Sequence, residues 1–219
     1  MSIFSYDSKV TNVFSFIGDM FILNVVYLAC CLPIVTIGAA QAGLHSATRV
    51  LIDKDNDNSA LKAFFKGFKN GFWTVTAVHT VFIVLDLILL YTLFMAFDYR
   101  ETGLFVHWAL PLVMLFLCLI LHSLVPLFHS KFGCKPFHLF RNCLILLISR
   151  PLRSLAVAVI VWAPLAVFFL NPNLFLDISV LFITVYFSVG FGLCAVMMQK
   201  PFDFLIDEID PDEEIEAVK

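Results

Sequence analysis

Charged side chains are scarce in this chain. Asp, Glu, Lys and Arg make up 14% of its 219 residues, whereas 61% are hydrophobic and 25 are Phe. Soluble globular proteins average about 25% charged and about 45–50% apolar residues. Together with a mean hydropathy of +0.94, this composition excludes an ordinary soluble protein and indicates an integral membrane protein.

Motifs for catalysis and nucleotide binding are missing. The sequence has no G-x-x-x-x-G-K-[ST] phosphate loop, no H-E-x-x-H zinc motif and no nucleophile elbow. The segments between the apolar stretches are too short to house a soluble catalytic domain. We therefore expect a protein that is not an enzyme and that needs no cofactor, no metal and no nucleic acid.

The six cysteines form no pattern typical of disulfides or metal sites. Four lie in or beside apolar stretches and two in a basic loop: Cys30, Cys31, Cys118, Cys194, and then Cys134 and Cys143. Because no extracellular cluster is visible, we expect free thiols.

Five apolar stretches are candidates to cross a bilayer, whose ~30 Å core needs about 20 helical residues. They are residues 14–35, 72–97, 106–128, 155–170 with an extension back to 144, and 178–198. Helices satisfy their own backbone in hydrocarbon, and the alternation typical of a barrel is absent. The first stretch ends at Pro33 without a signal-peptidase site, so we expect it to be retained. The sequence predicts an all-α polytopic protein with five transmembrane helices in a single membrane domain over residues 1–219.

Lys and Arg are concentrated in two connections. Five lie between the first and second stretches and five between the third and fourth, whereas the opposite side has only Lys9 and Arg100. The positive-inside rule then places both basic connections and the C-terminus in the cytoplasm and the N-terminus outside. The expected arrangement is two parallel hairpins, stretches one with two and three with four, followed by a fifth span.

The C-terminal residues 203–219 are acidic. They hold eight of the seventeen Asp and Glu residues and one base. We expect a solvated cytoplasmic tail, with masking of the basic loops and partner binding as the alternatives.

The pattern Phe-x-x-Phe-basic-Asn occurs twice, at residues 65–70 and 137–142, each time before an apolar stretch. Helical spacing makes both blocks short cytoplasmic amphipathic helices. They can lie in the inner membrane interface, with Phe in the acyl boundary and the bases at the headgroups. They can also dock onto a protein partner. The residues of this docking prediction are Phe64, Phe65, Lys66, Phe68, Lys69, Asn70, Phe137, Phe140, Arg141 and Asn142. Duplication of a hairpin and coincidence both explain the repeat.

Polar residues inside the apolar stretches form a further group of candidates: Asp19, Asn24, His79, Asp86 and His122. Asp86 is the most informative, because a charge at the bilayer centre costs at least ~2.5 kcal/mol and needs a partner or a proton. His79 lies on the same helix face, and His122 can approach if the hairpin packs tightly. The group can fix helix packing, form a proton relay or polar substrate path, or contact a partner subunit.

Residues 32–40 read Leu-Pro-Ile-Val-Thr-Ile-Gly-Ala-Ala, with Asn24 before them and residues 64–70 of the first block after them. This region resembles the YesL-like family of bacterial membrane proteins, best over about the first 80 residues. Its motif residues are Leu32, Pro33, Thr36 and Gly38. We expect Pro33 to end or kink the first span, Thr36 to cap the next helix and Gly38 to permit close packing.

The resemblance implies a biological setting. Such proteins are typically encoded in Gram-positive bacteria beside carbohydrate ABC importers, glycoside hydrolases and sugar-responsive regulators. It implies a multi-pass protein of the bacterial plasma membrane that acts as a noncatalytic accessory or assembly subunit beside importer permease subunits. One alternative is a stand-alone small transporter or channel, acting as a homo-oligomer with Asp86 in its path. Another is a membrane partner in sensing or in cell-envelope polysaccharide assembly.

Overall fold

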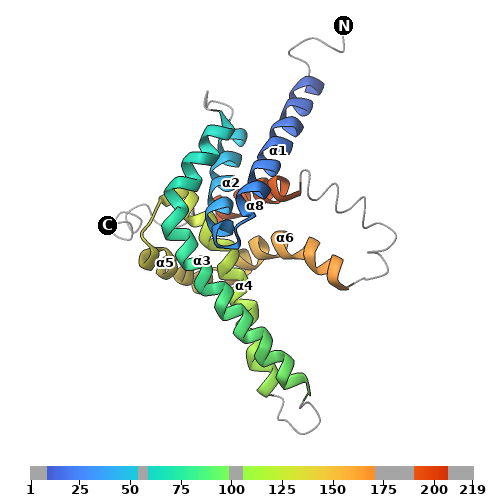
Figure 1. Cartoon of the computed structure of the whole chain (residues 1–219), viewed down its shortest axis with the longest axis vertical. Coiled ribbons are helices and arrows are strands. Elements are labelled where there is room, and N and C mark those ends of the chain that lie inside the picture. Colours follow the sequence, from blue (N-terminus) through green and yellow to red (C-terminus); the bar gives the residue numbers. More distant parts are fainter. Residues whose placement is uncertain (1–8, 54–58, 99–105, 171–189, 207–219) are drawn as a thin grey trace.

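The computed structural model describes residues 9–53, 59–98, 106–170 and 190–206 (Figure 1). Every regular element in these ranges is a helix, which confirms the all-α class for this part of the chain. The elements are α1 (Lys9–Cys31), the 3₁₀ turn η1 (Ile34–Thr36), α2 (Ile37–Ile52), α3 (Ala60–Asp98), α4 (Val106–Phe132), α5 (Pro136–Ser149), α6 (Pro151–Leu170) and α8 (Phe191–Ile206).

Three helices are long and apolar enough to cross a membrane, over Phe14–Cys31, Ala60–Ala96 and His107–Phe132. A fourth candidate is the bent pair Pro136–Ser149 and Pro151–Trp162. The described residues thus provide three to four candidate spans where the sequence predicted five. Most of the predicted span 178–198 lies outside the described residues.

The second predicted span is part of a longer helix. We expected it to begin at residue 72, after a separate amphipathic helix, but α3 is continuous from Ala60 to Asp98. At ~1.5 Å per residue its 39 residues extend about 58 Å, nearly twice the thickness of a bilayer core. The first Phe-rich block therefore lies near the start of the same continuous helix that forms the second predicted span.

The course of the first three helices differs from the predicted hairpin. The chain reverses at η1 and again between α2 and α3, so α1 and α3 run in the same direction (Figure 1). The sequence did not predict α2 as a span. Because α2 runs back toward the start of α1, the first two predicted spans are parallel and not antiparallel. The start of α1 and the start of α3 consequently lie at the same end of the molecule. The sequence had placed these two starts on opposite sides of the membrane.

Proline sets two helix ends. α1 ends at Cys31, two residues before Pro33, as expected. The proline ring disfavours the helical conformation of the residue before it. Proline also interrupts the extension of the fourth span back to residue 144, so this candidate span is a bent pair of helices. Arg150, before Pro151, leaves the helix with φ −141°, and α5 and α6 meet at an angle of 111°. Residue 144 therefore belongs to a separate helix.

The buried side chains form two clusters. The larger joins α4, α5, α6 and α8 with one side of α3, and includes Phe82, Leu124, Leu139 and Phe202. The smaller joins α1, α2, α3 and α8 through Leu23, Tyr27, Leu44 and Phe64. The helices α2, α3, α4 and α8 therefore surround the centre of the molecule, and polar side chains gather there.

Candidate functional site

Small residues allow α2 and α3 to pack closely. A Cβ atom on Gly38 would lie 2.8 Å from His79 Cβ, and one on Gly67 would collide with Ser46 Oγ. Five residues of α2 with small side chains are fully or almost fully buried: Gly38, Ala39, Ala40, Ala42 and Gly43. Helices approach this closely only where side chains are small. Gly38 of the motif thus has the packing role expected of it.

Thr36 has a different role from the one expected. It occupies the N-cap position of α2, but its side chain makes no cap hydrogen bond. Instead Thr36 Oγ1 lies 2.6 Å from Cys30 O and 2.7 Å from Pro33 O, and its single hydroxyl proton is shared between these two carbonyls. The hydroxyl therefore satisfies carbonyl groups at the end of α1 and in the turn after it.

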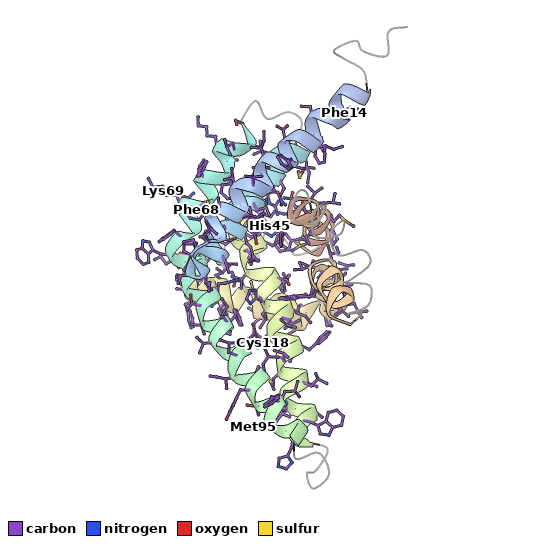
Figure 2. All side chains as sticks on the ribbon, turned by 45° about the vertical axis from the view of Figure 1, so that its right-hand side comes forward. Phe14, His45, Phe68, Lys69, Met95 and Cys118 are labelled. Atoms are coloured by element: carbon purple, nitrogen blue, oxygen red, sulfur yellow. The ribbon has the colours of Figure 1, made fainter. Side chains whose placement is uncertain are left out.

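The first Phe-rich block has a buried face and an exposed face. Phe64 is fully buried and stacks on Phe68, and both face α2. The opposite face carries exposed aromatic and basic residues, which we call the aromatic–basic stripe: Lys62, Phe65, Lys66, Lys69 and Trp73. Phe65 is 50% and Trp73 82% exposed. Figure 2 shows Lys69 on the outer side of α3. Asn70 is exposed beside the stripe.

The second block lies in different surroundings. It opens the 14-residue helix α5, after a turn in which Gly133 adopts φ +61°. Phe137, Phe140 and Arg141 are exposed, but Asn142 is buried, whereas Asn70 in the first block is exposed. Both blocks are helical and lie near the start of a helix, but the burial of their residues and the helices around them differ.

The structure brings three of the five intramembrane polar candidates together. His122 Nε2 of α4 lies 3.1 Å from His79 Nε2 of α3, and His122 Nδ1 lies 3.6 Å from Asp86 Oδ2. The antiparallel packing of α3 and α4 makes His122 the central member. The gap to Asp86 exceeds a hydrogen bond, and Asp86 Oδ1 and His122 Nδ1 have no hydrogen-bond partner.

The other two polar candidates lie elsewhere. Asn24 of α1 is fully buried, and its Oδ1 accepts a hydrogen bond from the Gly192 amide of α8 at 3.0 Å. Asp19 is exposed on α1. Asn24 therefore links two helices, and neither residue belongs to the cluster of His79, Asp86 and His122.

A cavity of about 120 Å³ lies next to His122, between α1, α2, α4, α6 and α8. Its polar lining comes from Gln41, His45, His122, Ser123 and Trp162, and aromatic walls come from Tyr27 and Phe191. Trp162 Nε1 donates to Ser123 Oγ at 3.0 Å. Figure 2 shows His45 inside the assembly, where it is 4% exposed. Polar groups from α2, α4 and α6 thus converge on one space.

His45 is held in its neutral form. Burial, and after it the positive charge of Arg49, lowers the pKa of His45 to about 3. His45 Nδ1 has no hydrogen-bond partner, while the His45 carbonyl accepts a bond from Gln199 Nε2 at 3.0 Å. This side chain is an unsatisfied neutral imidazole in the interior.

An ion network lies one turn beyond His45. Asp203 Oδ1 of α8 is 3.2 Å from Arg49 Nη1 of α2 and 3.3 Å from Lys131 Nζ of α4. Gln199, one turn earlier on α8, also donates to Thr48 Oγ1. The first acid of the predicted acidic tail therefore belongs to a folded helix and neutralises bases from both basic connections. Residues 207–219 lie outside the described part.

Within the described ranges, no group of three or more His, Cys, Asp or Glu side chains is placed to hold a metal ion. The arrangement offers hydrogen-bonding groups and one ion network.

Sequence reasoning missed several of the residues that meet at the cavity, including Gln41, Ser123 and Trp162. One local signal was available, because Gln41 and His45 are four residues apart and so lie on one face of a helix. Ser123 and Trp162 gave no such signal, since their contact depends on how α4 and α6 pack.

Comparison with known proteins gives a similarity over one part of the chain. No curated protein and no solved structure matches it. Residues 20–93, which comprise the second half of α1, all of α2 and nearly all of α3, match the protein family described as "Protein of unknown function, DUF624".

Proposed function

We propose that this chain is a noncatalytic accessory or assembly subunit of a carbohydrate ABC uptake system in the bacterial plasma membrane. The setting comes from the YesL-like resemblance. The aromatic–basic stripe on α3 is the observation that carries the proposal. Its aromatic side chains are exposed on a helix whose opposite face is fixed against α2 by Gly43 and Gly67. A rigid surface of this kind loses little conformational freedom when a partner binds.

Two features of the described residues support an accessory role over a sugar pathway within the chain. The cavity of about 120 Å³ is much smaller than the roughly 300–1,000 Å³ of typical small-molecule sites. In the apolar 18-residue stretch that qualifies each of the three candidate spans, no more than 44% of the residues are buried inside the described part of the chain. Much apolar helix surface is therefore free to contact lipid or the spans of a permease.

We assign the ends that carry the basic connections to the cytoplasm by the positive-inside rule. The contacts of Asp203 with Arg49 and Lys131 support placing the end of α8 on this side as well. The stripe then faces the cytoplasmic edge of a neighbouring membrane subunit.

Affinity purification from native membranes in mild detergent tests the proposal. We expect permease subunits to co-purify with the wild type and their recovery to fall at least several-fold in F65A/K66A/K69A. The matched control is F137A/F140A/R141A, which alters the second block. Both variants should remain in the membrane fraction. Recovery of the chain without permeases from wild-type membranes would refute the proposal.

A second function is favoured by the cluster of Asp86, His122 and His79. A carboxyl group within a span, beside two histidines, is typical of proton or ion pathways. As a stand-alone transporter or channel, the protein should give flux in proteoliposomes that Asp86→Asn abolishes. If wild-type proteoliposomes show no flux, the transporter function is contradicted, and the cluster has a packing role.

A further inference from the structure

The turn between α1 and α2 exposes large apolar side chains. Leu32, Ile34 and Val35 are 83%, 68% and 60% exposed. The sequence around them is free of charge, because no Asp, Glu, Lys or Arg occurs between Asp19 of α1 and Arg49 of α2. Adjoining apolar side chains that are exposed to this extent mark a surface for lipid or protein.

The packing of α2 against α3 shows where this turn lies along α3. In the middle of α2, Gly43 packs against Phe64 and Phe68, so this part of α2 is level with the lysines of the aromatic–basic stripe. At the start of α2, a Cβ atom on Gly38 would lie 2.8 Å from His79 Cβ. The chain from the middle of α2 back to the turn therefore runs along α3, away from the lysines.

The turn lies between the two ends of α3. At ~1.5 Å per residue, α3 rises about 15 Å from Lys69, the last base of the stripe, to His79, and a further 28 Å or so to its end at Asp98. The turn η1 contacts α3 as well. With 16 residues, α2 extends about 24 Å, which is less than the ~30 Å of a bilayer core. The turn is thus about half a core thickness from the basic end of α3 and does not reach the opposite end.

The backbone of the turn is suited to an apolar environment, in which polar backbone groups need partners within the protein. Pro33 has no N–H group to satisfy. The Thr36 amide donates to Pro33 O at 2.9 Å, and the Thr36 hydroxyl proton is shared between the carbonyls of Cys30 and Pro33. The Ile37 amide donates to Ile34 O. Pro33 and Thr36 of the motif therefore act together to reduce the number of free polar groups in this turn.

We propose that α1, η1 and α2 form a re-entrant hairpin whose turn inserts Leu32, Ile34 and Val35 among the lipid acyl chains of the leaflet on the basic side. Both arms of the hairpin then meet the aqueous phase on the side of the basic connections. In this arrangement α1 does not cross the bilayer, although it is long and apolar enough to do so.

Lipid is the occupant that the surroundings of the turn favour. The turn contacts α3, and beyond His79 this candidate span exposes the apolar side chains of Val81, Val84 and Leu87. The exposed apolar surface of the turn thus adjoins the surface of a helix that is itself suited to lipid. This inference is independent of the accessory role proposed above, which depends on the aromatic–basic stripe.

Nitroxide spin labels on Leu32→Cys and Val35→Cys test the proposal. The labelled full chain, without its native cysteines, is reconstituted in vesicles of phosphatidylethanolamine and phosphatidylglycerol. Oxygen concentrates in the acyl region of a bilayer, whereas a water-soluble nickel chelate is excluded from it. We expect both labels to collide with oxygen several-fold more often than with the chelate, as a label on Val84→Cys of α3 should. Lys62→Cys is the matched control in water and should show the reverse preference.

Two results would overturn the proposal. Frequent collisions of the turn labels with the chelate would place the turn in water, as when α1 crosses the whole bilayer. Rare collisions with both reagents would show that protein covers the turn in place of lipid.

A second measurement keeps the native cysteines, in case the variant without them does not fold. The fluorescence that Leu32→Trp adds to that of the wild type should be quenched by lipids brominated along their acyl chains and not by iodide. Quenching by iodide, or by neither reagent, would contradict the insertion of the turn into lipid.

Discussion

At the scale of single residues, the surroundings of a glycine determine its importance. Gly67 of α3 lies against Ser46 and Ala42 of α2, whereas nothing lies within 4 Å of a Cβ atom built on Gly18 of α1. Both are inside helices, where glycine itself costs about 0.5–1 kcal/mol relative to alanine. The same substitution should therefore have opposite effects at these two positions.

We expect Gly67→Ala to lower the free energy of unfolding by about 1–3 kcal/mol, because overpacking forces the two helices apart. Gly18→Ala should leave stability unchanged or raise it by up to about 1 kcal/mol. Thermal unfolding of both variants in the same detergent measures the difference. Equal stabilities would contradict the close α2–α3 contact.

His45 should make stability depend on pH. Its pKa is about 3 in the folded protein against 6.5 as the reference, so between these values the unfolded chain binds a proton that the folded chain does not. Stability should therefore fall as the pH decreases from 6.5. The loss is about 1.4 kcal/mol per pH unit, or roughly 2 kcal/mol at pH 5.

The measurement compares unfolding of the wild type and His45→Gln at pH 7 and pH 5. Other histidines contribute to both proteins, so the difference between the two pH effects isolates His45. A pH effect of the same size in both proteins would show that His45 is not the group responsible.

At the scale of elements, α8 is attached to the rest of the protein by contacts at both ends. In its first turn, the Gly192 amide donates a hydrogen bond to Asn24 Oδ1 of α1. In its later turns, Gln199 contacts α2, and Asp203 contacts both α2 and α4. Phe202, between these polar contacts, is fully buried under the guanidinium of Arg49. Loss of one polar contact should therefore loosen α8 locally without unfolding the protein.

Asp203→Asn should increase amide hydrogen exchange in the last turns of α8 by a few-fold, since partly exposed ion pairs contribute about 0–1 kcal/mol each. Exchange in α4 near Pro111 should not change. Asp19→Asn, at an exposed position of α1, is the control. Unchanged exchange in α8 would mean that burial of Phe202 alone holds this helix.

Sequence patterns predicted elements well where a local cause operates. The end of α1 before Pro33 and the start of α5 at Pro136 both follow from the backbone restrictions of proline. The merging of the first Phe-rich block into α3 was not predictable in this way. It depends on Gly67 and Phe64 packing against α2, which is a contact between residues about 20 positions apart.

At the scale of the whole molecule, the direction of α1 has a consequence for topology. Because α2 returns the chain, the start of α1 and the start of α3 lie at the same end (Figure 1). The basic residues near this end include Lys62 of α3, and Lys9 begins α1.

Single cysteines in a variant without native cysteines test this arrangement. We expect Lys9→Cys and Lys62→Cys to react with a membrane-impermeant maleimide from the same side of sealed vesicles. Arg100→Cys, in the connection between α3 and α4, should react from the other side. If Lys9→Cys and Lys62→Cys react from opposite sides, the parallel arrangement is contradicted, and the hairpin predicted from the sequence for the first two spans is supported.

The sequence by itself indicated a membrane environment and the helical class, because scarce charge and long apolar stretches are properties of composition and of short segments. It also identified Asp86 as a residue in need of a partner. Only the tertiary structure decided that His122 lies 3.6 Å from it, that His122 also lines a partly polar cavity, and that α1 and α3 are parallel. These features depend on contacts between helices far apart in the chain, and local patterns carry no information about them.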